Sequence, residues 1–86
     1  MNRDRFEIAR DILTVSDSED GAKKTWIILR SNLCYKQTKV YLPLLEGKDF
    51  LNIKNNGEDV RYITSGKGRE FLKYMKNIDD LFNNSE

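Results

Sequence analysis

Apolar residues recur along this chain with two different periods, and each period predicts a kind of element. In residues 4–15 they return every three or four positions, which predicts a first helix with a wide apolar face. Residues 26–29 are apolar in succession, so a second helix over about 24–31 is expected to be buried all round. Trp26 is then a core aromatic, with stacking on nucleic-acid bases as the alternative. The polar run 16–21 is expected to form an exposed acidic loop between the two helices.

The segment SNLCYKQTKVYLPLLEG, residues 31–47, predicts a turn and a third helix with two unlike faces. One face is expected to pack inward and carries Leu33, Thr38, Tyr41, Leu42 and Leu45. The other face carries Tyr35, Lys36, Lys39 and Val40. A helix with a packed back and a basic, aromatic front suits the major groove of DNA, which is wide enough to admit a helix. The alternative is an ordinary surface helix with solvated lysines.

The ends of this third helix carry unusual residues. Cys34 stands at the N-terminal cap, where Gln37 would complete a reciprocal pair of hydrogen bonds, although cysteine is a poorer cap than serine. The thiol is either redox-sensitive or, as we expect, inert. Pro43 lacks an N–H and crowds the carbonyl of Lys39, which predicts a kink or an irregular last turn. Gly47 is expected to close the helix in the left-handed conformation.

A period of two follows in residues 50–54 and 60–64, which predicts two short strands. Asn56-Gly57 between them is a hairpin turn signal, so the strands are expected to form a wing directly after the basic helix.

A cap at position 64 or 65 is expected to begin a final helix that reaches Asn83. Its second half is expected to overhang the domain and carries three large apolar groups: Ile78, Leu81 and Phe82. Exposed apolar groups at helical spacing argue for a partner helix. The alternative is a C-terminus that folds back or frays.

Composition limits the classes of function. The chain has 86 residues, one cysteine and no histidine. Neither a disulfide framework, nor histidine-dependent catalysis, nor a zinc site of the cysteine or histidine type is expected. There is no nucleophile–base pair and no phosphate-binding glycine-rich loop, so we expect no enzyme, no cofactor and no metal, and no small-molecule ligand is evident. No apolar run approaches membrane-spanning length, and we expect a soluble, reduced, cytoplasmic protein.

The net charge of +1 is unevenly distributed. Residues 1–21 carry −3, residues 22–48 carry +5 and residues 49–86 carry −1. A basic middle third is expected when one face of a protein follows phosphates.

The predicted order of elements is helix, helix, turn, helix, two-stranded hairpin and long helix. This order predicts an α+β, mostly helical, winged helix-turn-helix in a single domain, with a three-helix core and wing in residues 1–64 and a dimerisation helix in residues 65–86. The stretches GAKKTWIILRSNLCYKQTKVYLPLL and YITSGKGREFLKYMK resemble the small archaeal winged-helix DNA-binding family, over about residues 4–78. That family includes transcription regulators and chromatin-type proteins that dimerise through an antiparallel C-terminal coiled coil.

The resemblance implies a nucleoid-associated homodimer that binds double-stranded DNA and reads the major groove with the helix from Cys34 to Leu45. Nearest the bases would lie Tyr35, Lys36, Gln37 and Lys39. A lysine there would contact guanine and the glutamine an adenine edge. Lys23, Lys24 and Arg30 would approach phosphates, while Lys54 and Arg61 would flank the wing. The dimer interface would comprise Tyr74, Met75, Ile78, Leu81 and Phe82.

Three features depart from the family pattern. Cys34 replaces a serine-like cap, and Pro43 interrupts the reading helix. The wing tip carries Glu58 and Asp59, which would repel phosphate. A second hypothesis is therefore a winged helix used for protein–protein contact, which the near-neutral net charge and the acidic wing favour and the basic middle third disfavours.

Overall fold

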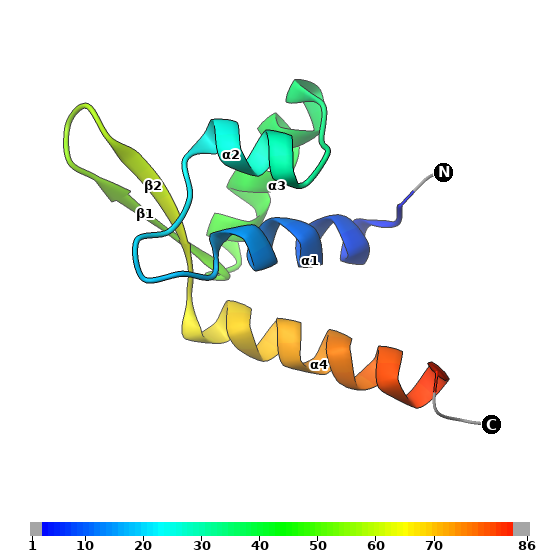
Figure 1. Cartoon of the computed structure of the whole chain (residues 1–86). Coiled ribbons are helices and arrows are strands. Elements are labelled where there is room, and N and C mark those ends of the chain that lie inside the picture. The colour runs from blue at the N-terminus through cyan, green and yellow to red at the C-terminus, as the bar shows by residue number, and fades with distance from the viewer. Residues whose placement is uncertain (1–2, 84–86) are drawn as a thin grey trace.

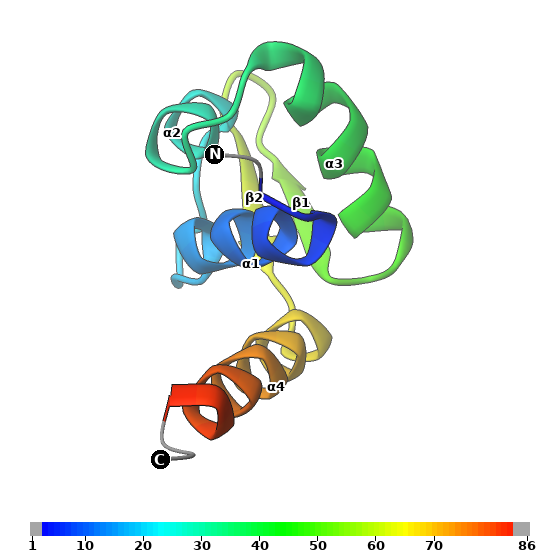
Figure 2. The ribbon, with the colours of Figure 1, turned by 90° about the vertical axis from the view of Figure 1, so that its right-hand side faces the viewer.

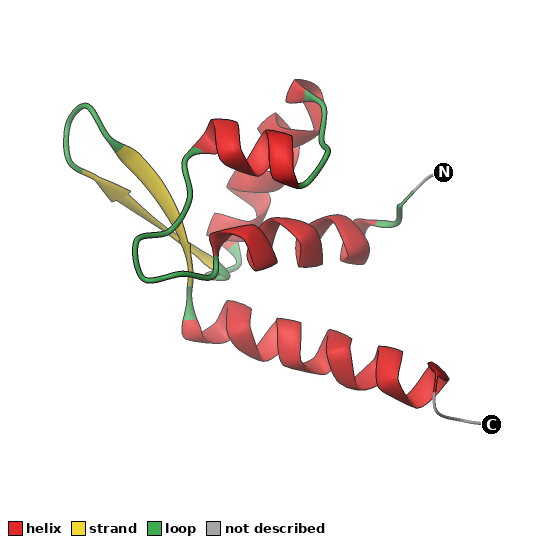
Figure 3. Ribbon diagram, in the orientation of Figure 1, coloured by secondary structure: helices red, strands yellow, loops and turns green. Residues whose placement is uncertain are grey.

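The computed structural model describes residues 3–83 and has the predicted order of elements. These residues form four helices and one two-stranded antiparallel sheet, whose arrangement can be followed in Figures 1 and 3. In chain order they are α1 (Arg5–Ser16), α2 (Lys24–Arg30), α3 (Tyr35–Gly47), β1 (Leu51–Asn55), β2 (Val60–Thr64) and α4 (Gly66–Asn83). No helix among them is long and apolar enough to cross a membrane.

The first three helices form one unit, and the hairpin and α4 leave it in different directions. The hairpin of β1 and β2 projects to one side, and α4 lies on the side of α1 opposite to α2 and α3 (Figures 1 and 2). The result is elongated, with principal extents of 51 × 28 × 20 Å. The third helix and the hairpin are therefore free of α4 over most of their length.

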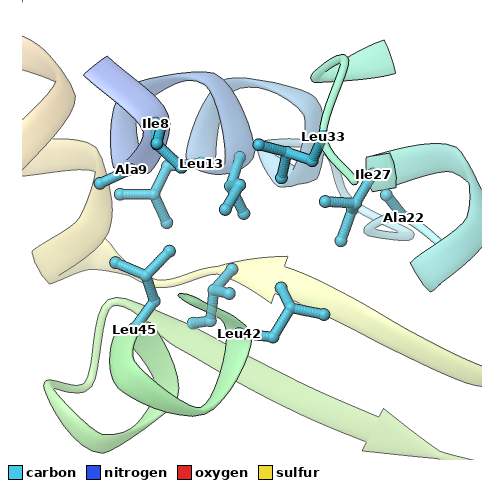
Figure 4. Close-up of a cluster of buried hydrophobic side chains, with 10 residues drawn as sticks. Ile8, Ala9, Leu13, Ala22, Ile27, Leu33, Leu42 and Leu45 are labelled. Atoms are coloured by element: carbon cyan, nitrogen blue, oxygen red, sulfur yellow. The ribbon is translucent and has the colours of Figure 1, made fainter. Parts of the chain in front are cut away.

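The core lies where α1, α2 and α3 meet the base of the hairpin. Figure 4 shows Leu13 of α1, Ile27 of α2 and Leu42 of α3 converging in it. All five residues predicted on the inner face of α3 and its preceding turn are buried or half-buried, so that face is confirmed.

The second helix is not buried all round. Ile27 is fully buried, but Leu29 is 80% exposed and Trp26 is half-buried. A helix of two turns presents only one side to α1 and β2, and positions two apart point to nearly opposite sides of a helix. The uniform apolar run therefore predicted more burial than one short helix achieves.

Side-chain caps define where α1, α3 and α4 begin. Asp4 and Glu7 form a capping box on α1, and Ser65 Oγ accepts from the Gly68 N–H at 3.0 Å at the start of α4. At α3 the predicted box is present: the Cys34 thiol accepts from the Gln37 N–H at 3.4 Å, and Gln37 Oε1 accepts from the Cys34 N–H at 3.1 Å.

The third helix ends later than predicted. It continues through Pro43 to Gly47, so the proline does not end it, and the glycine lies inside it. The left-handed residue is instead Asp49, with φ of 64°. Its N–H donates to Glu46 O and the next N–H, from Phe50, donates to Leu45 O, both at 2.9 Å. This is a Schellman closure, in which the left-handed residue lies two positions beyond the last helical one.

The wing has the predicted form, with β1 starting one residue later than expected. Leu51 pairs with Thr64 and Asn55 with Val60, which leaves a four-residue tip. Gly57 in the tip has φ of 89°, a conformation that glycine adopts without strain. Ala22 adds an isolated bridge to Tyr62 of β2.

The last helix is anchored at its start and lies along α1 further on. A Cβ on Gly68 would collide with the backbone carbonyl oxygen of Phe50 and lie 2.7 Å from Thr64 Cγ2, so glycine is required for this close approach. Further along, Asp79 Oδ2 lies 3.7 Å from Arg10 Nη1 of α1. The second half of α4 was predicted to overhang the domain, but this ion pair holds it beside α1. Its apolar side chains are nevertheless exposed, with Ile78 52% and Leu81 73% accessible.

Candidate nucleic-acid interface

The outer face of α3 is accessible to solvent. Tyr35 at its first turn is 60% exposed, and Lys36, Lys39 and Val40 are exposed beside it. The buried back of the helix fixes this orientation, because a rotation would expose Leu42 and Leu45. The cap at Cys34 fixes where the helix begins. The cap and the buried residues together determine which side chains the helix presents to solvent.

Tyr35 joins α2 to α3 through two cations. Lys24 Nζ lies 5.5 Å and Lys39 Nζ 5.7 Å from its ring centroid. Ammonium groups at this distance are attracted by the face of an aromatic ring, by about 0.5–1 kcal/mol at an exposed site. We call Lys24, Tyr35 and Lys39 the Tyr35 cluster. It holds two positive charges from two helices at the start of α3.

Trp26 gathers a second set of cations. Arg61 Cζ lies 4.9 Å, Arg30 Cζ 5.4 Å and Lys23 Nζ 5.7 Å from the Trp26 ring. Arg61 is also held by Asp59, with Nε 3.1 Å from Oδ1. We call Trp26, Lys23, Arg30, Arg61 and Asp59 the Trp26 cluster. Its cations come from the segment before α2, the end of α2 and strand β2. The tryptophan is half-buried and packs against the core, as expected of a core aromatic, while its ring also attracts these three cations.

The two clusters lie toward opposite faces of the wing. Tyr62 and its partner Ile53 line a shallow groove of about 180 Å³ together with Lys24 and Lys39. Arg61 is the next residue to Tyr62, so it points to the other face, where its partner Lys54 also lies. The predicted DNA-binding residues therefore form two basic surfaces, one between α3 and the wing and one behind the wing.

Two predicted features have less freedom than their sequence positions suggested. Gln37 uses its side-chain oxygen in the helix cap, so a two-point contact with an adenine edge would cost that hydrogen bond. At the wing tip Asp59 is paired with Arg61, which leaves Glu58 as the exposed acid there.

Arg3 clamps the turn between α2 and α3, a contact that no local pattern in the sequence predicts. Arg3 Nη1 donates to Ser31 O at 2.7 Å and pairs with Asp11 Oδ2 at 2.5 Å, while Nη2 donates to Asn32 O at 2.8 Å. Asn32 has φ of 53°, a left-handed conformation that asparagine tolerates better than most residues. The guanidinium thus satisfies two carbonyls beyond the end of α2, from 28 and 29 residues away.

The predicted interface residues of α4 are placed as follows. Tyr74, Ile78, Leu81 and Phe82 are exposed, whereas Met75 is half-buried.

A helix-turn-helix followed by a β-hairpin against its last helix defines the winged-helix class of protein. This chain belongs to the winged helix-turn-helix family, whose model matches residues 2–83. Among solved structures it is similar to Sso10a-2, a DNA-binding protein from Sulfolobus solfataricus, with a TM-score of 0.81 and 26% sequence identity. That match covers 95% of this chain and 84% of the other. Among curated proteins, none matches the chain. The family expected from the sequence and the predicted fold class are both confirmed.

Proposed function

We propose that this protein binds double-stranded DNA and inserts α3 into the major groove, as a transcriptional regulator or an architectural protein of the nucleoid without enzymatic activity. The main support for the proposal is that α3 has two unlike faces. One face is buried in the core, and the other exposes Tyr35, Lys36 and Lys39 beside the wing. The structural relative is itself described as a DNA-binding protein, which supports the same conclusion.

The two basic surfaces suggest different contacts. Lys36 and Lys39 on the front of α3 are the candidates for base edges and for phosphates at the groove rim. Lys23, Arg30, Lys54 and Arg61 are candidates for flanking phosphates. The aromatic and carboxylate partners of Lys23, Arg30 and Arg61 would limit side-chain motion before binding and so lower the entropy lost in the complex. Phosphate contacts would supply most of the affinity and make it strongly dependent on salt.

We also propose that α4 forms a homodimer with the same helix of a second copy. Tyr74, Ile78 and Leu81 are exposed on α4 and recur at spacings of four and three residues, the pattern of a coiled-coil seam. Phe82 is one position away from that spacing and Met75 is half-buried, so neither is central to the seam. A dimer would present two α3 helices to two half-sites, which favours pseudo-palindromic DNA.

The test is a fluorescence-anisotropy titration of a labelled duplex at two salt concentrations. The variant Lys36→Ala/Lys39→Ala is compared with wild type and with Lys73→Ala/Lys76→Ala, which removes the same charge from exposed positions on α4. We expect the α3 variant to bind much more weakly and the α4 variant to bind like wild type. Equal loss in both variants would mean that binding follows net charge and that α3 is not the reading helix.

A further inference from the structure

A cavity of about 390 Å³ opens between the start of α1, the end of α3 and the start of α4, away from both basic surfaces. Four aromatic rings line it: Phe6, Tyr41, Phe50 and Phe71. Two of them are in contact, with the Phe50 and Phe71 centroids 5.4 Å apart. Figure 4 shows Ala9 and Leu45, which also line it, at the end of the core beside α4.

The apolar lining extends to the surface. Phe6 is 50% and Leu44 43% exposed, and both line the cavity. Phe6 is one of the apolar residues that recur along residues 4–15, but it lies at the edge of the core beside this cavity. Cavities of roughly 300–1,000 Å³ that are mostly apolar, with a few convergent polar groups, are the usual form of small-molecule sites.

The charged groups of this cavity all have one sign. Arg5 and Lys48 are the two charged residues in its lining, and no carboxylate lines it within the described part of the chain. Arg5 stacks on Phe6, with Cζ 5.0 Å from the ring centroid. Among residues 3–83 neither Arg5 nor Lys48 forms an ion pair with a carboxylate. An occupant would meet aromatic walls and two positive charges with unused hydrogen-bonding capacity.

We propose that this cavity binds a small organic carboxylate with an aromatic or compact apolar body. The apolar body lies against Phe50 and Phe71, and the carboxylate pairs with Arg5 and Lys48. A guanidinium and a carboxylate match in geometry and form a charge-assisted pair, which selects an acid over a neutral molecule of the same shape. Three lining residues belong to α3 itself, namely Tyr41, Leu44 and Leu45. A bound ligand would therefore contact α3, the helix that we propose inserts into DNA. An effect on DNA binding rests on that proposed function, whereas binding of the ligand does not.

The experiment titrates the ¹⁵N-labelled full chain with naphthoate, without DNA, and follows backbone amide shifts. Naphthylmethanol is the neutral ligand of similar shape. The variant Arg5→Gln/Lys48→Gln removes both charges from exposed positions, so its fold is retained, and a thermal melt verifies this. Lys73→Gln/Lys76→Gln is the control with the same loss of charge.

We expect saturable shifts at Ala9, Leu45 and Phe50 with naphthoate. Naphthylmethanol with wild type, and naphthoate with Arg5→Gln/Lys48→Gln, should each bind about tenfold more weakly. The control variant should match wild type. Equal binding of acid and alcohol, shifts centred on α2 and α3 lysines, or no saturation would overturn the proposal.

Amide shifts at the cavity that change with protein concentration, together with no binding of naphthoate, would also overturn the proposal. A second copy of the chain would then cover the cavity. Because DNA is absent, none of these failures bears on the DNA-binding proposal, which is tested separately by anisotropy.

Discussion

Replacing Arg3 with alanine removes the clamp on the turn between α2 and α3. Three contacts disappear: two hydrogen bonds to backbone carbonyls and the ion pair with Asp11. Hydrogen bonds with one charged partner contribute about 1.5–3 kcal/mol each when water is excluded. The side chains of Arg3 and Asp11 are 27% and 25% exposed, which reduces each contribution. We therefore expect a loss of about 2–3 kcal/mol in the free energy of unfolding.

For a domain of this size about 1 kcal/mol corresponds to 4–8 °C, so Tm should fall by about 8–24 °C. Thermal unfolding followed by far-ultraviolet circular dichroism measures the change. Arg5→Ala is the matched control: among the described residues this neighbour forms no ion pair and only stacks on Phe6. It should change stability by less than about 0.5 kcal/mol. Arg3→Lys keeps the charge but not the two-pronged geometry and should fall between the two.

Equal melting temperatures for Arg3→Ala and Arg5→Ala would refute the clamp. A second readout separates the clamp from a direct DNA contact. At a temperature where both proteins are folded, Arg3→Ala should weaken DNA binding without changing the salt dependence, because no phosphate contact is lost. A shallower salt dependence would instead place Arg3 on the DNA.

Three further predictions concern α4 and the end of α3. Gly68→Ala should destabilise the fold by about 1–3 kcal/mol in urea unfolding, because its Cβ would collide with the Phe50 carbonyl oxygen and lie 2.7 Å from Thr64 Cγ2. Gly66→Ala should be neutral, because its Cβ would lie 3.9 Å from Arg69 Nη2, an ordinary contact. Asp49→Gly should raise stability by about 0.5–1 kcal/mol by relieving the left-handed φ of 64°, and an unchanged or lower Tm would contradict this. Ile78→Glu should convert a dimer to a monomer in sedimentation velocity, and a wild-type monomer at all concentrations would reject the seam.

The elements that could be predicted from the sequence are those whose signals are local. The period of apolar residues in α1 and α3, the caps at Cys34 and Ser65 and the Asn56-Gly57 turn each depend on neighbours within a few positions. These predictions agree with the structure to within a residue or two, except at the end of α3. There the choice between Gly47 and Asp49 depended on where Phe50 packs, because the Schellman closure requires its N–H to reach Leu45.

The features that escaped prediction depend on contacts between distant residues. Leu29 and Ile27 look alike in sequence, and only the direction of α2 against α1 decides which is buried. Similarly, nothing near Arg3 indicates that its guanidinium reaches the turn at Asn32.

The candidate site shows the same division. The basic front of α3 follows from local periodicity alone. The gathering of Arg30 and Arg61 around Trp26 needs the wing to fold back toward α2, which one sequence does not reveal.

The most direct test of the central claim is the salt dependence of duplex binding for wild type and for Lys36→Ala/Lys39→Ala. If α3 lies in the groove, log K should fall steeply with log salt for wild type, and the variant should lose affinity and show a shallower slope, by about 0.9 for each lysine that contacts a phosphate. Wild-type binding that is absent at low salt, or a variant whose affinity and slope equal those of wild type, would contradict the account.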